Sequence, residues 1–238
     1  MEGLEKYLSK RVILSNLLLF LLSLTCITPV FAQSSSTGKI RFSMWAPLEA
    51  YPGTKEAALA DDNVFSYPIS RLKTTAPFFI EGMVCGWEFT YTPSDNIRNV
   101  SEHFEFAPLY SISSLKQTIT YKEPWIQDNR LYCWVEYQCS PQVNAWRNAW
   151  QTSGYRKISG NGIGLLTDGF DGIKFAAQEA LKTAVRDYAR GITKNKPRKI
   201  TGEVMISNAP VIGIKSGRYT VSLDFYLNIN NIIWYNTY

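Results

Sequence analysis

Residues 218–229 alternate almost perfectly between apolar and polar side chains, and this pattern constrains the fold more than any other in the chain. The apolar members of the alternation are Tyr219, Val221, Leu223, Phe225, Leu227 and Ile229. Successive side chains of a β-strand point to opposite faces, so a strand with this pattern buries one face and keeps the other in water. Its backbone groups need partners on neighbouring strands. The pattern therefore predicts a half-buried β-sheet.

Weaker patterns elsewhere predict the partner strands. They are expected around residues 40–44, 78–92, 115–121, 131–137, 200–207 and 211–214. The proline-rich residues 46–77 are expected to be loop-like, with at most one short helix at residues 55–60. A second loop is predicted from a group of glycines, namely Gly154, Gly160, Gly162 and Gly164. The short connections between the strands favour antiparallel pairing.

The best helical pattern runs from Ile173 to Arg190, where apolar residues recur every three or four positions and form one alanine-rich stripe. Gly191 is expected to end this helix, and Asp168 or Asp171 is expected to cap its start. A shorter helix is expected after Ser140, which precedes a proline. Strand runs on both sides of one long helix predict an α+β fold, with antiparallel sheets and that amphipathic helix packed on a face.

The first 32 residues have the three parts of a secretory signal peptide. The basic residues at its start are Lys6, Lys10 and Arg11. An almost unbroken apolar run covers residues 17–24, and Ala32 completes a small-x-small cleavage pattern before Gln33. Two alternatives remain open: an uncleaved membrane anchor at residues 12–30 and a lipid anchor at Cys26. The sequence therefore predicts export to the periplasm or the cell exterior.

The expected mature chain, residues 33–238, is long enough for a single exported α+β domain with its own core. The net charge of +5 is mild and spread along the chain, so nucleic acid is not expected as a partner. No apolar run after the leader approaches about 18 residues, so no transmembrane helix is expected after cleavage. A single histidine and few cysteines argue against a metal site, and no cofactor is expected.

Three cysteines remain after the leader, namely Cys85, Cys133 and Cys139. An oxidising compartment permits one disulfide among them. If one strand runs through Cys133 and Cys139, their α-carbons are about 20 Å apart, which is too far for a disulfide. A bridge would therefore join Cys85 to Cys133 or to Cys139.

No catalytic residues are predicted. Hydrolysis by a serine or cysteine nucleophile usually needs a histidine base, and His103 is the only histidine. Its place in an alternating stretch with Phe104 and Phe106 predicts a solvated strand residue. The glycines at residues 160–164 lack the lysine and hydroxyl residue of a phosphate loop, and a Gly-x-Ser-x-Gly elbow is absent.

Two features are candidates for ligand contact. Trp146 and Trp150 lie four residues apart on the predicted short helix, where they form either a stacking platform for a sugar or lipid, or part of the core. The core interpretation is favoured, because most aromatics of strand-rich chains are buried. The basic residues 194–199 form either a solvated connector or a contact for anionic envelope lipids or polymers.

These observations favour a non-catalytic exported protein of the cell envelope that binds or scaffolds an envelope protein or polymer. An outer-membrane β-barrel is one alternative, because aromatic Tyr238 ends a strand-rich chain. An exported hydrolase that acts on envelope polymers is the other. The leader indicates where the protein works, and the missing catalytic pattern argues against an enzyme.

Overall fold

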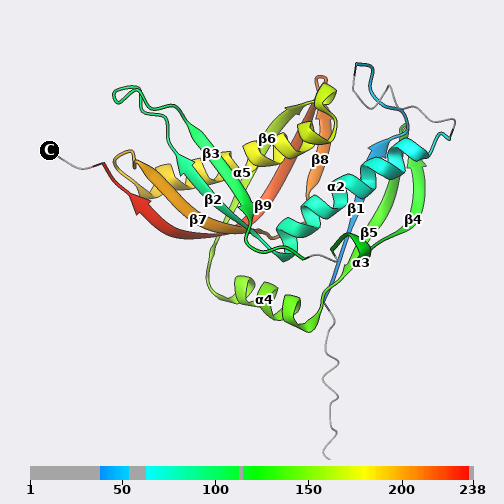
Figure 1. Ribbon diagram of the computed structural model, residues 1–238, viewed down its shortest axis with the longest axis horizontal. Coiled ribbons are helices and arrows are strands. Elements are labelled where there is room, and N and C mark those ends of the chain that lie inside the picture. The colour runs from blue at the N-terminus through cyan, green and yellow to red at the C-terminus, as the bar shows by residue number, and fades with distance from the viewer. Residues whose placement is uncertain (1–37, 54–62, 113–114, 236–238) are drawn as a thin grey trace, which may run out of the picture. The chain divides into compact units, whose positions relative to one another are not determined.

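A computed structural model of the chain describes residues 38–53, 63–112 and 115–235. They form an α+β fold with antiparallel sheets and several helices, as the sequence predicts (Figure 1). The predicted signal peptide at residues 1–32 lies outside the described residues, and so does the predicted short helix at residues 55–60.

A three-stranded sheet contains β1 (Lys39–Pro47), β4 (Ile119–Gln127) and β5 (Arg130–Gln138). β5 lies in the middle, and both pairings are antiparallel. The alternation predicted for β1 and β5 is confirmed, because Phe42, Cys133 and Val135 are buried on one face of the sheet. Helix α2 (Ser66–Val84) packs along this sheet, as Figure 1 shows.

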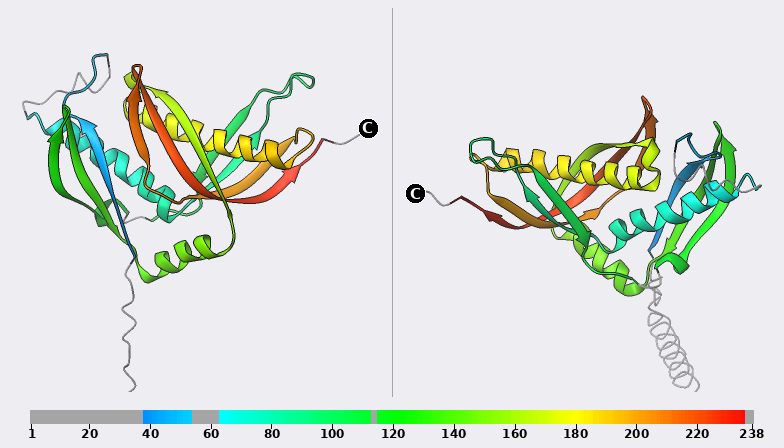
Figure 2. Two further views of the ribbon diagram at one scale, coloured as in Figure 1. Left: turned by 180° about the vertical axis from the view of Figure 1, so that it is seen from behind. Right: turned by 45° about the horizontal axis from the view of Figure 1, so that its top comes forward.

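The second sheet has six strands. They are β2 (Trp87–Thr92), β3 (His103–Pro108), β6 (Arg156–Leu165), β7 (Lys199–Ile206), β8 (Val211–Lys215) and β9 (Arg218–Ile233). β9 pairs with β6 along one edge and with both β7 and β8 along the other, and all three pairings are antiparallel (Figure 2). β9 contains the alternating residues 218–229, and its apolar set from Tyr219 to Leu227 is buried as predicted.

Helix α5 (Phe170–Ile192) packs on β6 and β9, where the sequence predicts a helix (Figure 2). The buried stripe includes Ala177, Ala180 and Ala184. Two details of the prediction are wrong. Gly169 is the residue before the helix and no side chain caps it, so neither aspartate is a cap. Gly191 lies inside the helix rather than after it, because the helix continues to Ile192.

Gly154 lies in an irregular segment as predicted, but the rest of the predicted glycine-rich loop is strand β6, and the β6 glycines face α5. Gly160, Gly162 and Gly164 occupy alternate positions, and all three are buried. A Cβ atom on them would collide with the backbone carbonyls of α5 at Ala180, Ala176 and Gly172, respectively. The helix backbone therefore lies directly on the strand backbone, and this close approach requires glycine.

Helix α2 corrects the prediction that residues 46–77 form a loop and residues 78–92 a strand. Pro68 lies in the first turn of α2, where a backbone N–H has no partner within the helix, so proline is tolerated there. Pro77 lies inside the helix and is buried. Only the last part of the predicted strand is a strand, namely β2. The described residues therefore contain two long helices rather than one.

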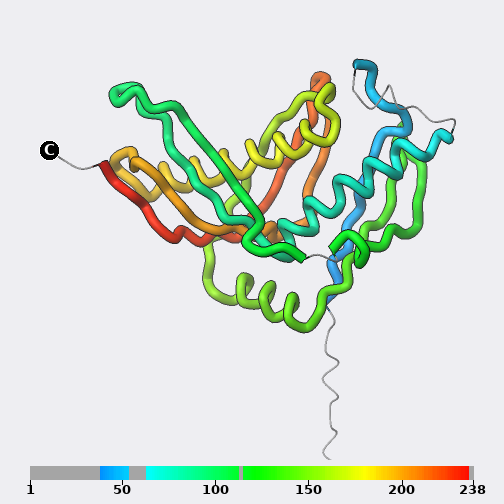
Figure 3. The backbone as a smooth tube through the Cα atoms, viewed as in Figure 1, coloured from blue at the N-terminus to red at the C-terminus, as the bar shows by residue number. Residues whose placement is uncertain are grey.

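Two short helices connect the sheets. α3 (Leu115–Thr118) precedes β4, so the segment predicted as a strand from residue 115 begins as a helical turn. α4 (Pro141–Thr152) connects β5 to β6, and Figure 3 follows this path. The Ser140 side chain accepts a hydrogen bond from the Val143 backbone N–H at 3.3 Å, which confirms the predicted cap.

A buried carboxylate lies among cations on the three-stranded sheet. Glu136 is 5% exposed, and its oxygens lie 2.6 Å from Lys39 Nζ, 3.0 Å from Lys122 Nζ and 3.1 Å from Arg41 Nε. The hydrogen bonds from Lys39 and Lys122 hold the pKa of Glu136 below its ordinary value. Lys39 and Arg41 lie on β1 and Lys122 lies on β4, so the cluster links β1, β5 and β4 electrostatically.

We expect this cluster to make stability depend on pH in the acid range. A depressed carboxylate pKa stabilises the fold above the ordinary value of 4.5, and this contribution is lost as the pH falls through the lower pKa of the folded state. Glu136→Gln should therefore lower the free energy of unfolding at neutral pH and flatten its decrease below pH 4.5. Urea unfolding across this pH range measures both effects. Glu123→Gln, at an exposed partner of Arg41, is the control that should retain the wild-type pH profile.

Candidate functional site

An open groove of about 790 Å³ lies between the start of α2 and strands β4 and β5. Its helix side is lined by Asn63, Phe65, Ile69, Leu72 and Lys73. Its sheet side is lined by Tyr121, Pro124, Trp125, Ile126, Leu131 and Cys133. The volume is within the range of about 300–1,000 Å³ that is typical of small-molecule sites.

A bulge in β4 shapes the sheet side of the groove. The pairing with β5 shifts register between Lys122 and Trp125, and Glu123 has a φ of 49°. A bulge adds one residue to a strand, so the side chains beyond it change faces. Tyr121 and Ile126 are separated by an odd number of positions, so a regular strand would place them on opposite faces. Because of the bulge, both side chains line the groove. The strand expected around residues 115–121 extends past Pro124 to Gln127.

The groove has a buried floor and an exposed apolar rim. Leu72, Leu131 and Cys133 form the floor, and all three are buried. On the rim, Phe65 and Ile69 are each 41% exposed and Ile126 is 56% exposed. Exposed apolar side chains grouped at a concave surface are typical of binding sites. The groove therefore provides a continuous apolar surface from solvent to the core.

Lys73 is the one charged side chain among the described residues that line the groove. Burial raises the pKa of Tyr121 to about 12 and that of Cys133 to about 11, so both groups stay neutral near pH 7. Lys73 is exposed and forms no ion pair with another described residue. The groove is therefore apolar, with a single positive charge at its wall.

The two tryptophans singled out from the sequence lie on α4 and do not line this groove. Trp150 is 2% exposed, whereas Trp146 is 36% exposed. Their ring centroids are 6.0 Å apart with the planes at 78°, an edge-to-face contact. A stacking platform needs two exposed ring faces with a similar orientation. Trp150 therefore packs in the interior, and only Trp146 has a partly accessible ring.

The three described cysteines are buried free thiols, so the bridge that the sequence permits between Cys85 and Cys133 or Cys139 is not formed in the structure. Cys133 faces the groove. Cys139 Sγ lies 3.9 Å from Arg147 Nη1. Burial raises the pKa of Cys85 to about 12, and it also raises the pKa of Cys139. At neutral pH these side chains are therefore protonated and weakly nucleophilic.

His103 lies at the start of β3 and is exposed, which confirms the predicted solvated strand residue. Its Nε2 atom is 2.8 Å from Oε1 of Glu105, whose side chain is also exposed. Among the described residues, no group of three or more His, Cys, Asp or Glu side chains is placed to hold a metal ion. In the same part of the chain, no helix has the length and apolar character needed to cross a membrane.

The comparisons with known proteins cover most of the chain. A protein-family model matches residues 26–235. A relative from Treponema pallidum (strain Nichols), described as an uncharacterized protein, is 25% identical over 213 residues, which is 88% of each chain. No solved structure matches. The matched residues include both sheets and the groove.

Proposed function

The chain belongs to the protein family whose model spans residues 26–235, and we propose that it is an exported, non-catalytic binding protein of the cell envelope. Its ligand is an extended apolar chain with an anionic end, such as a lipid acyl chain, held in the groove between α2 and β4–β5. The single observation that carries the proposal is the apolar groove of about 790 Å³ with an exposed apolar rim.

The groove favours an acyl chain over a peptide. A peptide strand needs backbone partners, which a regular sheet edge would provide. β4 is the edge strand nearest the groove, but its edge is interrupted by the bulge at Glu123 and by Pro124, which has no N–H to donate. Prolines and bulges block strand addition at sheet edges. An acyl chain needs no hydrogen bonds and gains free energy from the burial of its apolar surface.

Lys73 provides the reason for an anionic end group. The Lys73 ammonium has no carboxylate partner among the described residues, so it can pair with a carboxylate or phosphate of the ligand. The other described lining residues cannot compensate a charge, because they are uncharged and Tyr121 and Cys133 stay neutral. A neutral chain of the same length should therefore bind more weakly than an acid.

Export is part of the same proposal, and it rests on the leader at residues 1–32. A relative of similar length in the bacterium Treponema pallidum supports a bacterial envelope. Acyl chains are abundant there, and a protein that shields one from water needs an apolar groove.

Native mass spectrometry of the protein exported by its own cells tests location and ligand together. We expect a mature chain that begins at Gln33 and a co-purified adduct with the mass of a lipid. A retained leader, or a lipid attached covalently at Cys26, would contradict cleavage before Gln33. A chain without any bound lipid, which also fails to bind a fluorescent fatty acid, would overturn the groove proposal.

Substitutions in the groove, with one matched control outside it, test whether the ligand binds there. Ile126→Glu puts a charge on the groove rim, and we expect it to weaken fatty-acid binding by at least about tenfold because the charge opposes the burial of an acyl chain. Ile163→Glu is the control, since Ile163 is similarly exposed (51% against 56%) but lies on β6. Lys73→Ala should weaken binding of the acid but not of the matching alcohol. Equal losses in Ile126→Glu and Ile163→Glu would contradict the placement.

A further inference from the structure

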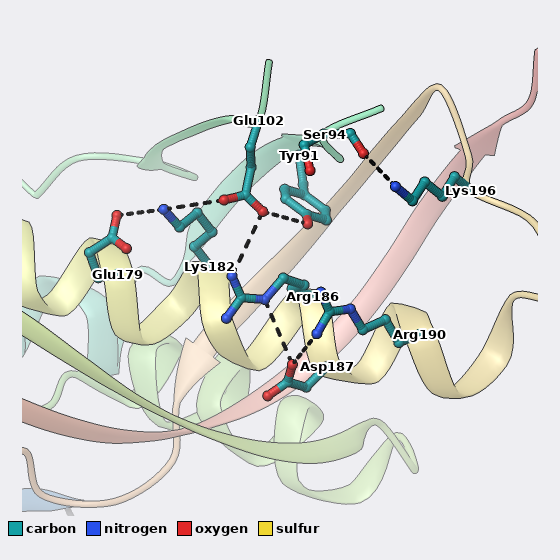
Figure 4. A network of polar contacts seen from close by, with 9 residues as sticks. All are labelled: Tyr91, Ser94, Glu102, Glu179, Lys182, Arg186, Asp187, Arg190 and Lys196. Carbon is teal, nitrogen blue, oxygen red and sulfur yellow. Dashed lines mark hydrogen bonds and ion pairs between the residues drawn. The ribbon is translucent and has the colours of Figure 1, made fainter. Parts of the chain in front are cut away.

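A second, polar pocket of about 200 Å³ lies at the C-terminal end of α5, and none of its lining residues belongs to the groove. Four segments meet there. The chain after β2 contributes Ser94, the chain before β3 contributes Glu102, and α5 contributes Arg186 and Arg190 (Figure 4). The connector from α5 to β7 completes the wall and includes Lys196.

The pocket has a strong excess of positive charge. Its described lining residues include four cationic side chains, namely Arg186, Arg190, Lys194 and Lys196. They include a single carboxylate, on Glu102. Cations near the C-terminal end of a helix stabilise it through the helix dipole, which explains why the side chains here are positively charged. The dipole does not explain why they line one pocket together with residues from the β2–β3 hairpin.

The guanidinium groups of this pocket are not saturated by carboxylates. Arg186 Nη1 is 3.9 Å from Glu102 Oε1, and Arg186 Nε is 3.7 Å from Asp187 Oδ1. Arg190 Nη1 is also 3.7 Å from Asp187 Oδ1. These distances exceed the roughly 3.2 Å limit of a good N–H···O hydrogen bond. Arg186 Nε is buried and has no hydrogen-bond partner among the described residues.

The carboxylate of Glu102, the only one among the described lining residues, is held by other partners. Glu102 Oε1 accepts a hydrogen bond from the Tyr91 hydroxyl at 2.8 Å, and Glu102 Oε2 lies 3.6 Å from Lys182 Nζ. Burial of Tyr91 raises its pKa, so this hydroxyl remains a donor. Figure 4 shows Glu102 between Tyr91, Lys182 and Arg186. Glu102 therefore leaves most guanidinium N–H groups open to a ligand.

We propose that this pocket binds a phosphate group. Guanidinium groups present paired N–H donors that match the oxygens of phosphate, and two of them lie here beside lysine ammonium groups. One Lys196 N–H is used, by the Ser94 carbonyl at 3.0 Å, and the others remain available. The volume is below the usual range for drug-sized ligands, so it suits one small anion. The phosphate comes either from a soluble phosphate compound or from a lipid head group.

Titration of the mature protein with inorganic phosphate, followed by calorimetry at low ionic strength, tests the proposal. We expect one saturable site. Arg190→Gln should weaken binding by at least about tenfold, because a charge-assisted, paired contact is lost. Arg190 has a side chain that is 73% exposed, so its replacement should leave the fold intact. Arg156→Gln, at an exposed arginine on β6 outside the pocket, is the control and should bind as the wild type does.

Glu102→Gln separates a binding role from a structural one. The glutamine carbonyl can still accept the Tyr91 hydrogen bond, while the removal of a negative charge should tighten phosphate binding severalfold. If the cations served only to stabilise the fold, this variant would change the melting temperature and leave phosphate affinity unmeasurable, which would overturn the proposal. Equal weakening in Arg190→Gln and Arg156→Gln would overturn it too.

Sedimentation with vesicles identifies the source of the phosphate. Phosphatidylcholine vesicles with and without phosphatidylglycerol are compared. Binding that requires phosphatidylglycerol and is lost in Arg190→Gln assigns a lipid head group. Saturable binding of inorganic phosphate without vesicle binding assigns a soluble phosphate compound. Failure in both assays would overturn the phosphate site, and it would leave the groove proposal untouched because fatty-acid binding is measured separately.

Discussion

Replacing Gly162 by alanine is expected to lower the free energy of unfolding by at least about 3 kcal/mol, at the upper end of overpacking effects. The new methyl group would collide with the Ala176 carbonyl oxygen and lie 2.5 Å from the Ala180 backbone nitrogen. Both atoms belong to the backbone of α5, so no side-chain rotation can relieve the contact. The helix would have to move away from β6 and lose its close packing there. Urea unfolding of the purified variant measures the loss.

Gly191→Ala is the matched control. It makes the same chemical change in the last turn of the same helix, where an added Cβ meets nothing within 4 Å. Alanine favours helix over glycine, so this variant should gain up to about 1 kcal/mol. The two substitutions should therefore have opposite signs. Similar small effects in both would show that β6 and α5 are not in backbone contact.

The second large effect is expected at Trp150. Its ring is 2% exposed and contacts Tyr155, with centroids 4.7 Å apart, as well as Trp146. Trp150→Ala should cost about 3–5 kcal/mol, because it removes a large buried ring and leaves a cavity. Trp146→Ala should cost only about 1 kcal/mol, because that ring is partly exposed and has less contact area to lose. Thermal and urea unfolding of both variants measure the two losses of stability and show which is larger.

A ligand assay on the same two proteins decides what Trp146 does. If Trp146 stacks on a sugar or lipid, its replacement would lower binding of that ligand while the melting temperature changes little. If it serves only as a lid over Trp150, binding would be unchanged. A larger stability loss from Trp146→Ala than from Trp150→Ala would contradict the burial seen in the structure.

The strands were predictable where apolar and polar side chains alternate with a period of two residues. β1, β5 and β9 each have one buried face, and side-chain alternation records this directly in the sequence. Helix α2 was not predictable, because Pro68 and Pro77 are loop signals unless tertiary packing overrides them. Met83 and Cys85 also share parity with Trp87 by coincidence, which extended the strand pattern backwards into the helix.

The glycines of β6 are a second case in which local sequence preference predicts the wrong structure. Glycine weakens an isolated strand, so three of them in alternation suggest a loop. Their role becomes visible only when α5 is placed against them, because the constraint is a contact between Gly162 and a helix that begins later in the chain. Long-range contact, rather than local preference, decides the structure here.

The two candidate sites were missed for a related reason. The groove takes lining residues from α2, β4 and β5, and no local motif connects Ile69 with Ile126 or Leu131. One part of the phosphate pocket was predictable, because the basic connector at residues 194–199 is evident in the sequence. The contributions of Arg186 from α5 and of Glu102 from the chain before β3 required the fold.

The central position of β9 determines the order in which the protein can assemble. β9 is the last described strand to be synthesised, yet β6 and β8 have it as their only strand partner among the described residues. The second sheet is therefore incomplete until residues 218–233 have left the ribosome or, in an exported chain, have crossed the membrane. The pairing of β6 with β9 spans a long sequence separation, so it is slow to form, and the waiting strand is exposed to aggregation. A chaperone that protects unpaired strands would thus act on this protein until its final strand arrives, and a chain truncated just before β9 would stay dependent on it.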